Sequence, residues 1–285
     1  MIYSQGNLCT CMNFGAGRSI VILSSIPYRL EEECRIGRAI LKYAKKKVLR
    51  VYSLGTAEAT MARTISEIAN GRIETLSCSP NVENLRSFYA YGVPPYATFF
   101  HGPFHHLTAE RMKSESPLRQ FADGFDLIFE DTTFQMYSRN RHDQIRFVSQ
   151  HLKPDGLFMC VEKFKGTTED EYALRGWQKD FGFKARYFST ADIKAKKDTI
   201  LDLMDRNEVT LQEFAHTLMG LFSHSVVTWN SGNFYTVLAS NNRANLDRFV
   251  SGLSEPAIPA EYVYESIPFS PTPTEENAIS PIPSR

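Results

Sequence analysis

Two adjacent acidic residues, Glu130 and Asp131, stand where chemistry is most expected in this sequence. They end the apolar run FDLIFED, which has the length and composition of a buried strand. Neighbouring carboxylates are costly to bury without partners, so such a pair more often marks the edge of a site than the interior of a core. A carboxylate at a strand end can accept a proton, which makes Asp131 a candidate catalytic residue.

A second group of titratable residues is the segment HGPFHH, residues 101–106, which follows an apolar run. His105 is a candidate general base because an imidazole has a pKa near neutrality, although a solvated loop histidine is the simpler interpretation. His101 and His105 would share a face only on a helix, and Gly102-Pro103 opposes a helix here. No metal site is therefore predicted.

The elements that position these residues alternate between strands and helices. The predicted strands are residues 47–55, 72–80, 97–104, 125–132 and 157–164, the helical segments are 59–71, 81–92 and 142–156 with its final turn, and a hairpin is expected over 225–241. This alternation predicts an α/β fold with a mostly parallel sheet, helices on both faces and a C-terminal antiparallel hairpin. Ligands bind such sheets beyond the carboxyl ends of the strands.

The order of elements and several motifs resemble the class I S-adenosylmethionine (SAM) methyltransferases over residues 26–241. Within that superfamily the pattern is most similar to the carboxy-SAM synthases, which act in tRNA wobble-uridine modification. The motifs are Ile26-Pro27-Tyr28, SCSPNVENLR (77–86), LKPDGLFMCVEKF (152–164) and the spacing from Trp229 through Asn233-Phe234 to Ala239. The resemblance implies a Rossmann-like methyltransferase fold and SAM as the cofactor.

The resemblance also implies which residues contact the cofactor. They precede the first helix or follow the first four strands: Tyr28, Gly55, Thr56, Ala57, Glu58, Ser77, Cys78, Pro103, Phe104, Glu130 and Asp131. In carboxy-SAM synthases an arginine near the position of Arg186 reaches the carboxylate of the modified cofactor. Arg186 is therefore the third catalytic candidate, beside Asp131 and His105.

Two positions depart from the superfamily pattern. In the turn SLGTAEA (53–59) only Gly55 remains of the glycines that let the backbone approach the cofactor. Ser77 replaces the acidic residue that accepts both ribose hydroxyls, and each charge-assisted hydrogen bond is worth roughly 1.5–3 kcal/mol. Glu58 is the better substitute acceptor, because strand alternation turns Glu74 to the other face. The alternative for Glu58 is an exposed carboxylate in the first turn of a helix.

Three functions are compatible with this pattern. The first is a SAM-dependent methyltransferase with an unidentified acceptor, either a small molecule or an RNA-related compound. The second is a carboxy-SAM synthase-like enzyme, and the third is a non-enzymatic protein that has kept the fold and lost the cofactor. The two departures favour the third, while fold analogy supports all three equally. The methyltransferase is the working hypothesis.

Charge and composition restrict the partners and the location. Lys+Arg and Asp+Glu each number 32, which argues weakly against bulk attraction to nucleic acid or membrane. The odd count of 5 cysteines predicts no disulfide framework and a cytoplasmic protein, and Cys9 and Cys11 lack the second pair of a zinc finger. No stretch approaches the roughly 18 apolar residues of a membrane helix, and we recognise no signal peptide. A homodimer is left open.

Composition also predicts the domain boundaries. Residues 1–25 form an N-terminal extension and residues 26–253 the methyltransferase-like domain. Residues 254–285 hold seven of the chain's 14 prolines, a density that opposes helices and strand ladders. We therefore expect a flexible tail from Ser254 onward, whose removal leaves the fold intact.

Overall fold

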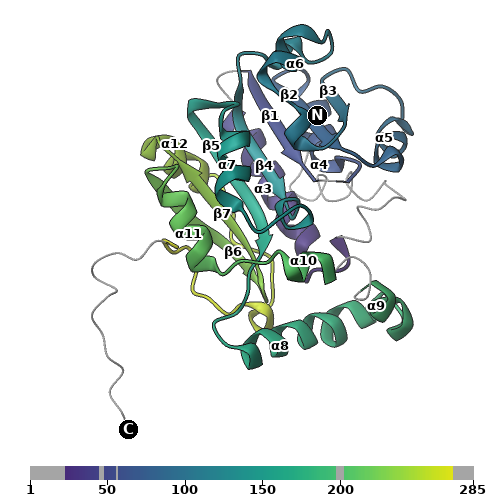
Figure 1. The fold of residues 1–285 in the computed structure, drawn as a ribbon, viewed down its shortest axis with the longest axis vertical. Coiled ribbons are helices and arrows are strands. Elements are labelled where there is room, and N and C mark those ends of the chain that lie inside the picture. Colours follow the sequence, from purple (N-terminus) through teal and green to yellow (C-terminus); the bar gives the residue numbers. More distant parts are fainter. Residues whose placement is uncertain (1–22, 45–47, 56, 197–201, 272–285) are drawn as a thin grey trace.

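A single mixed sheet of seven strands forms the centre of the part of the chain that the structure describes (Figure 1). The structure is a computed structural model and describes residues 23–44, 48–55, 57–196 and 202–271. The strand order is β3-β2-β1-β4-β5-β7-β6, with β1 to β5 parallel and β7 antiparallel to both of its neighbours. The strands are β1 (Leu49–Leu54), β2 (Ile73–Ser79), β3 (Ala97–His101), β4 (Phe125–Asp131), β5 (Leu152–Lys163), β6 (His224–Ser231) and β7 (Phe234–Ser240). The predicted α/β class, the mostly parallel sheet and the hairpin are confirmed.

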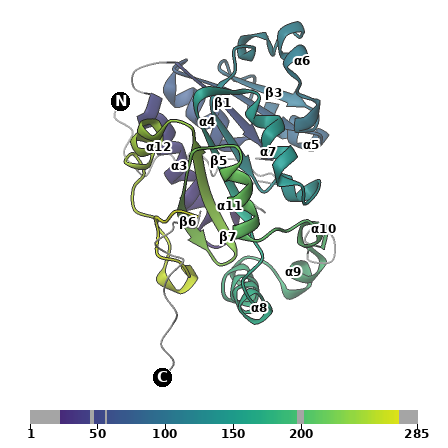
Figure 2. The same ribbon diagram turned by 60° about the vertical axis from the view of Figure 1, so that its left-hand side comes forward.

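Helices cover both faces of this sheet, which gives three layers (Figure 2). Apolar side chains of α3, α4 and α12 pack on one face, and those of α6, α7 and α11 on the other. The helices are α3 (Arg29–Tyr43), α4 (Thr60–Ala69), α5 (Val82–Tyr89), α6 (Ala109–Ser114), α7 (Arg141–Ser149), α8 (Glu169–Trp177), α9 (Thr190–Lys196), α10 (Asp202–Arg206), α11 (Leu211–Met219) and α12 (Arg243–Val250). Short turns of helix are η2 (Phe104–His106), η3 (Arg119–Phe121), η4 (Phe134–Met136), η5 (Gln178–Phe183), η6 (Lys184–Arg186) and η8 (Ala260–Tyr262). Along the described ranges, none of the helices has the length and apolar character needed to span a membrane.

The central strands are apolar at nearly every position because helices shield both of their faces. Every residue of β4 is buried, including the acidic residues at its ends. The sequence therefore displays continuous apolar runs here rather than the alternation of a half-exposed strand. This burial is also why the charged residues at the strand ends need partners inside the protein.

A helical arm, residues 169–196, lies across the carboxyl edge of the sheet (Figure 1). It comprises α8, the π-helix η5, η6 and α9. Lys163, the last residue of β5, anchors the arm: its Nζ lies 2.6 Å from the hydroxyl of Tyr172 in α8 and 2.7 Å from Asp205 in α10, and it also pairs with Glu208. These bonds hold the arm over the edge where α/β proteins bind their ligands.

Residues 254–271 pack against the domain, so the prediction of a flexible tail from Ser254 is wrong for them. Tyr262 is 2% exposed, and Phe269 exchanges two backbone hydrogen bonds with β6. Proline prevents a helix but not an extended segment that lies along a surface, which is how a proline-rich stretch becomes part of the fold. The remainder of the predicted tail, 272–285, lies outside the described residues.

Cys34 corrects a second expectation. It is buried in α3 and disulfide-bonded. The sequence predicted no disulfide framework because the cysteine count is odd and the chain is large. Of the extension predicted over 1–25, residues 1–22 also lie outside the described part.

Candidate functional site

The turn after β1 lies against the loop after β4 at the carboxyl edge of the sheet. Gly55 has a φ of 72°, a left-handed conformation that residues with a side chain rarely adopt. A Cβ at this position would overlap the hydroxyl of Thr133 and lie 2.7 Å from the carbonyl oxygen of Asp131. Glycine is required here by both the backbone angle and the close approach of the two segments.

A buried group of charged residues, which we call the acid–arginine cluster, lies at this edge. Its members are Arg29 and Glu33 of α3, Glu58 of the turn before α4, and Asp131 at the end of β4. Arg29 Nη2 lies 2.9 Å from Asp131 Oδ2, and Arg29 Nη1 lies 3.6 Å from Glu33 Oε2. Glu58 interacts electrostatically with Glu33. Through the side chains of Arg29 and Glu33, helix α3 thus interacts with both the end of β4 and the turn after β1.

The acid–arginine cluster contains three carboxyl groups and one guanidinium. Burial raises the pKa of Glu33 to about 7; Arg29 opposes this shift, and repulsion from Asp131 and Glu58 adds to it. Burial also raises the pKa of Asp131, against the attraction of Arg29. Asp131 Oδ1 and Arg29 Nε have no hydrogen-bond partner within the described residues. Buried polar atoms of this kind are normally satisfied, so the cluster is suited to a polar or cationic ligand.

The raised pKa of Glu33 predicts a pH-dependent stability that Glu33→Gln should remove. The folded-state pKa of about 7 exceeds the value of about 4.3 expected in an unfolded chain, so the folded protein binds the extra proton between these values. The resulting stabilisation is complete below about pH 4 and is lost as the pH rises through about 7. The free energy of unfolding can be measured with urea at about pH 5 and about pH 8. The difference between these two values should be larger in the wild type than in the variant by up to about 3 kcal/mol. Glu83→Gln, at an exposed position of α5, is the control, and an unchanged pH dependence in Glu33→Gln would contradict the prediction.

Glu130 and Asp131 point to opposite faces of the sheet because side chains alternate along a strand. Glu130 accepts hydrogen bonds from the backbone N–H groups of Thr133 and Phe134, which closes the turn after β4. This orientation gives Glu130 a structural role. The predicted contact between Glu130 and a cofactor receives no support from it, whereas Asp131 belongs to the acid–arginine cluster.

A second buried group surrounds Glu130 on its own face. Its carboxyl lies close to the Cys160 thiol and the Glu162 carboxyl of β5. Burial and repulsion from Glu162 raise the pKa of Glu130 well above its usual range, which favours the neutral form of its carboxyl group. Arg141 Nε binds Glu162 Oε1 at 2.5 Å and balances its charge. The group is therefore close to electrically neutral and stabilises the junction of β4 and β5.

Ser77 lies within β2, which continues to Ser79, and not at the end of the strand as the sequence predicted. Its side chain is buried, and its Oγ has no hydrogen-bond partner among the residues described. Glu74 pairs with Arg50 at 3.3 Å, which removes it as an alternative ligand for a ribose. Ser77 therefore places one orphaned buried hydroxyl near the carboxyl end of β2.

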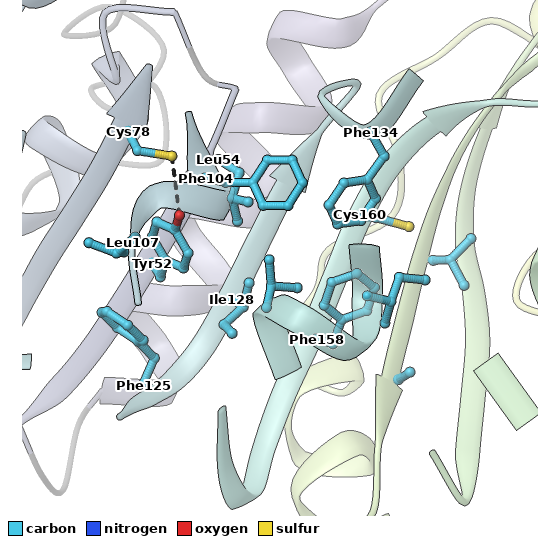
Figure 3. Close-up of a cluster of buried hydrophobic side chains, with 14 of the residues drawn as sticks. Tyr52, Leu54, Cys78, Phe104, Leu107, Phe125, Ile128, Phe134, Phe158 and Cys160 are labelled. Carbon is cyan, nitrogen blue, oxygen red and sulfur yellow. Dashed lines mark hydrogen bonds between the residues drawn. The ribbon is translucent and has the colours of Figure 1, made fainter. Parts of the chain in front are cut away.

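Cys78 and Phe104, both predicted to contact the cofactor, point into the hydrophobic core (Figure 3). Cys78 Sγ lies 3.2 Å from the Tyr52 hydroxyl, and burial raises the pKa of the thiol to about 12. The Phe104 ring packs edge-on against Phe134 at 5.5 Å. A ligand contact from Cys78 is therefore restricted to its backbone. Pro103 is half-buried before η2 and remains a predicted contact.

The turn after β1 contains two further predicted contacts. Ala57 is buried and has a φ of 47°, and Ala59, which follows Glu58, has a φ of 58°. Thr56 lies outside the described residues. The backbone of the turn is thus left-handed at two alanines, in a turn where the resemblance led us to expect glycines.

The other two catalytic candidates lie on different elements. His105 is exposed on η2, where it packs against Tyr137, and burial together with His106 lowers its pKa, so the imidazole is neutral at pH 7. Arg186 Nη2 donates to the Tyr262 hydroxyl at 3.2 Å. The Tyr262 ring also packs against Tyr28 at 5.8 Å. Tyr28 and Arg186 thus both contact Tyr262. His105 lies on a different element, η2.

Arg29 and Glu33 were missed in the sequence, although a signal was present. Helix α3 begins with RLEEECR, and its Arg29, Glu32, Glu33 and Arg35 are all buried. The Arg29–Glu33 spacing is that of an i,i+4 pair, which usually forms on an exposed helix face. Charged pairs among the core positions of a helix can therefore indicate an internal site.

Comparison with known proteins supports the fold. No protein-family model matches the sequence, and no curated protein matches it. The plantazolicin methyltransferase BpumL in complex with SAH (S-adenosylhomocysteine) superposes with a TM-score of 0.51 and 11% identity, covering 83% of this chain and 90% of that one. The plantazolicin methyltransferase BamL, in complex with a triazolic desmethylPZN analog and SAH, gives 0.52 and 12%, covering 84% and 96%. The chain has the class I methyltransferase fold, as the resemblance implied.

Proposed function

We propose that this protein is a SAM-dependent methyltransferase. The observation that carries the proposal is the acid–arginine cluster, in which three carboxyl groups face one guanidinium at the carboxyl edge of a methyltransferase-type sheet. SAM has a sulfonium cation and an ammonium group, and a buried excess of carboxyl groups favours such a ligand. BpumL and BamL, which share the fold, form complexes with SAH.

The residues at this edge fit SAM in charge and in backbone conformation. The left-handed turn at Gly55, Ala57 and Ala59 leads into α4, whose first N–H groups face the carboxyl edge. We assign Glu58 to the cationic end of SAM, and we assign the orphaned Ser77 hydroxyl to the ribose. A single hydroxyl holds a ribose more weakly than a carboxylate does, so we expect micromolar to sub-millimolar affinity.

The chain itself supplies orientation and proton removal. When bound, SAM supplies an electrophilic methyl group. Arg29 holds Asp131 Oδ2, and Asp131 Oδ1 has no partner among the described residues, so we assign Oδ1 the acceptance of a proton from the O–H or N–H of the acceptor. Burial raises the pKa of Asp131 and makes its carboxylate a stronger base. We propose a small-molecule or RNA-related acceptor, with a homodimer as one option.

A carboxy-SAM synthase-like activity is the second candidate. The meeting of Tyr28 and Arg186 at Tyr262 supports it, because a guanidinium beside the cofactor suits a carboxylated ligand. Arg186→Met should then weaken the binding of carboxy-SAM about tenfold and leave the binding of SAM unchanged. Equal affinities in the two proteins would remove this candidate.

Calorimetry with SAM and SAH tests the proposed methyltransferase function. Glu58→Gln should weaken SAM binding about tenfold and SAH binding much less, because SAH lacks the sulfonium charge. Glu74→Gln is the control, since Glu74 lies near the amino end of β2, away from the candidate site, and pairs with Arg50. Failure of wild-type protein to bind either ligand at millimolar concentration would favour the non-enzymatic alternative. An equal loss for SAM and SAH would contradict the charge argument.

A further inference from the structure

Two lysines are buried side by side on the arm. Lys179 of the π-helix η5 and Lys184 at the start of η6 are 8% and 2% exposed. Their ammonium groups bind the same carboxylate: Asp180 Oδ1 lies 2.6 Å from Lys179 Nζ and 2.9 Å from Lys184 Nζ. A π-helix is rare and often occurs at functional sites, and here its wider turn brings residues five apart to one carboxylate.

The charges of this lysine pair are not balanced. Within the described residues, Asp180 is the only carboxylate that forms an ion pair with either ammonium group. Burial and repulsion from Lys184 lower the pKa of Lys179 to about 7, which reflects the cost of holding two cations against one anion. Lysines are seldom buried without full pairing. Among the residues that the structure describes, the pair therefore has one carboxylate for two ammonium groups, which leaves a place for an added anion.

The lysine pair adjoins the candidate site. Phe183, between the two lysines in sequence, packs its ring against Tyr28 at 5.7 Å, and Tyr28 precedes Arg29 of the acid–arginine cluster. The Arg186 guanidinium lies 5.8 Å from the centre of the same Phe183 ring. Three basic residues therefore stand on the segment of the arm that contacts the start of α3.

We propose that Lys179 and Lys184 bind an oxyanion, a carboxylate or a phosphate, on the arm beside Tyr28. The assignment of this anion to the methyl acceptor rests on the proposed methyltransferase function; the anion site itself does not. An acceptor bound there is held through its charge on the arm, while its reacting atom extends toward Asp131.

Titration calorimetry of the full chain with sulfate and with malonate tests the site. Lys179→Met leaves Lys184 and Asp180 as a balanced ion pair, so the variant should fold and bind either probe at least about tenfold more weakly. Asp180→Asn removes the competing carboxylate, so it should bind them several-fold more tightly. Lys113→Met, an exposed lysine on α6, is the control for non-specific attraction and should change neither affinity.

Opposite effects of Lys179→Met and Asp180→Asn would support the site, because general damage to the fold weakens binding in both variants. Tighter binding of sulfate would indicate a phosphate-bearing ligand, and tighter binding of malonate a carboxylate. The absence of probe binding by wild-type protein, or equal affinities in wild type and Lys179→Met, would overturn the proposal. SAM affinity measured on the same samples separates the hypotheses: anion binding without SAM binding keeps the anion site and rejects the methyltransferase.

Discussion

A chain that ends at Leu253 is expected to unfold at a temperature about 10 °C or more below that of the full protein. Such a truncation removes the packed segment 254–271. The apolar side chains lost with it include the buried Tyr262 and the core-packing Ile267 and Phe269. Burial of each large apolar side chain is worth about 1.5–3 kcal/mol, and a net loss of about 3–5 kcal/mol lowers the melting temperature of a domain of this size by about 10 °C or more.

Hydrogen bonds and a cation–π contact add to the effect of the truncation. The carbonyl of Tyr262 accepts a bond from Gly232 N at 2.9 Å, and the Tyr264 ring lies 4.2 Å from the Arg175 guanidinium. Arg175 belongs to the arm, so the truncation should loosen the arm as well as β6. Hydrogen exchange should therefore increase in α8 as well as in the hairpin.

The matched control is a chain that ends at Pro271, which keeps every one of these contacts. Thermal unfolding of the two truncated chains distinguishes a packed segment from a tail. A melting temperature for the shorter chain within roughly 2 °C of the control would show that the segment contributes nothing and would restore the sequence-based prediction.

The strands and the hairpin could be predicted because their sequences are locally consistent. FDLIFED is apolar at successive positions because both faces of β4 are covered, and the alternation of such runs with helices leaves few other folds. Gly55 was recognised for the same reason: its place after a strand requires a left-handed turn. These features depend on neighbours in sequence.

The remaining features depend on partners distant in sequence. Arg29 is read as an ordinary surface residue of a helix until Asp131, about a hundred positions later, is placed beside it. The prolines after Ser254 exclude regular structure but give no information about the surface on which an extended chain packs. Ser77 lies inside the predicted strand 72–80, and only the register of β2 with its neighbours shows how far it stands from the carboxyl end of the strand.

Arg29→Met is expected to destabilise the protein by about 3–5 kcal/mol at about pH 8, because the variant leaves buried carboxylates without their cation. Arg29 is fully buried, and it lies within 2.9 Å of Asp131 and 3.6 Å of Glu33. The control is Arg243→Met at an exposed position of α12, where an arginine has the same i,i+4 relation to an acid, Asp247. An exposed pair of this kind contributes about 0–1 kcal/mol.

The loss caused by Arg29→Met should depend on pH and on Asp131. Without the guanidinium, the folded-state pKa values of Asp131 and Glu33 rise further, so the folded protein binds more protons than the unfolded chain and stability falls as the pH rises. The variant should therefore recover part of its stability at about pH 5. Asp131→Asn removes one unpaired carboxylate, so the double variant Arg29→Met/Asp131→Asn should be more stable than Arg29→Met alone. A double-mutant cycle from urea unfolding measures this coupling. Strictly additive effects, or a loss that is the same at both pH values, would show that Arg29 acts through packing alone and that the cluster does not hold its carboxylates by charge.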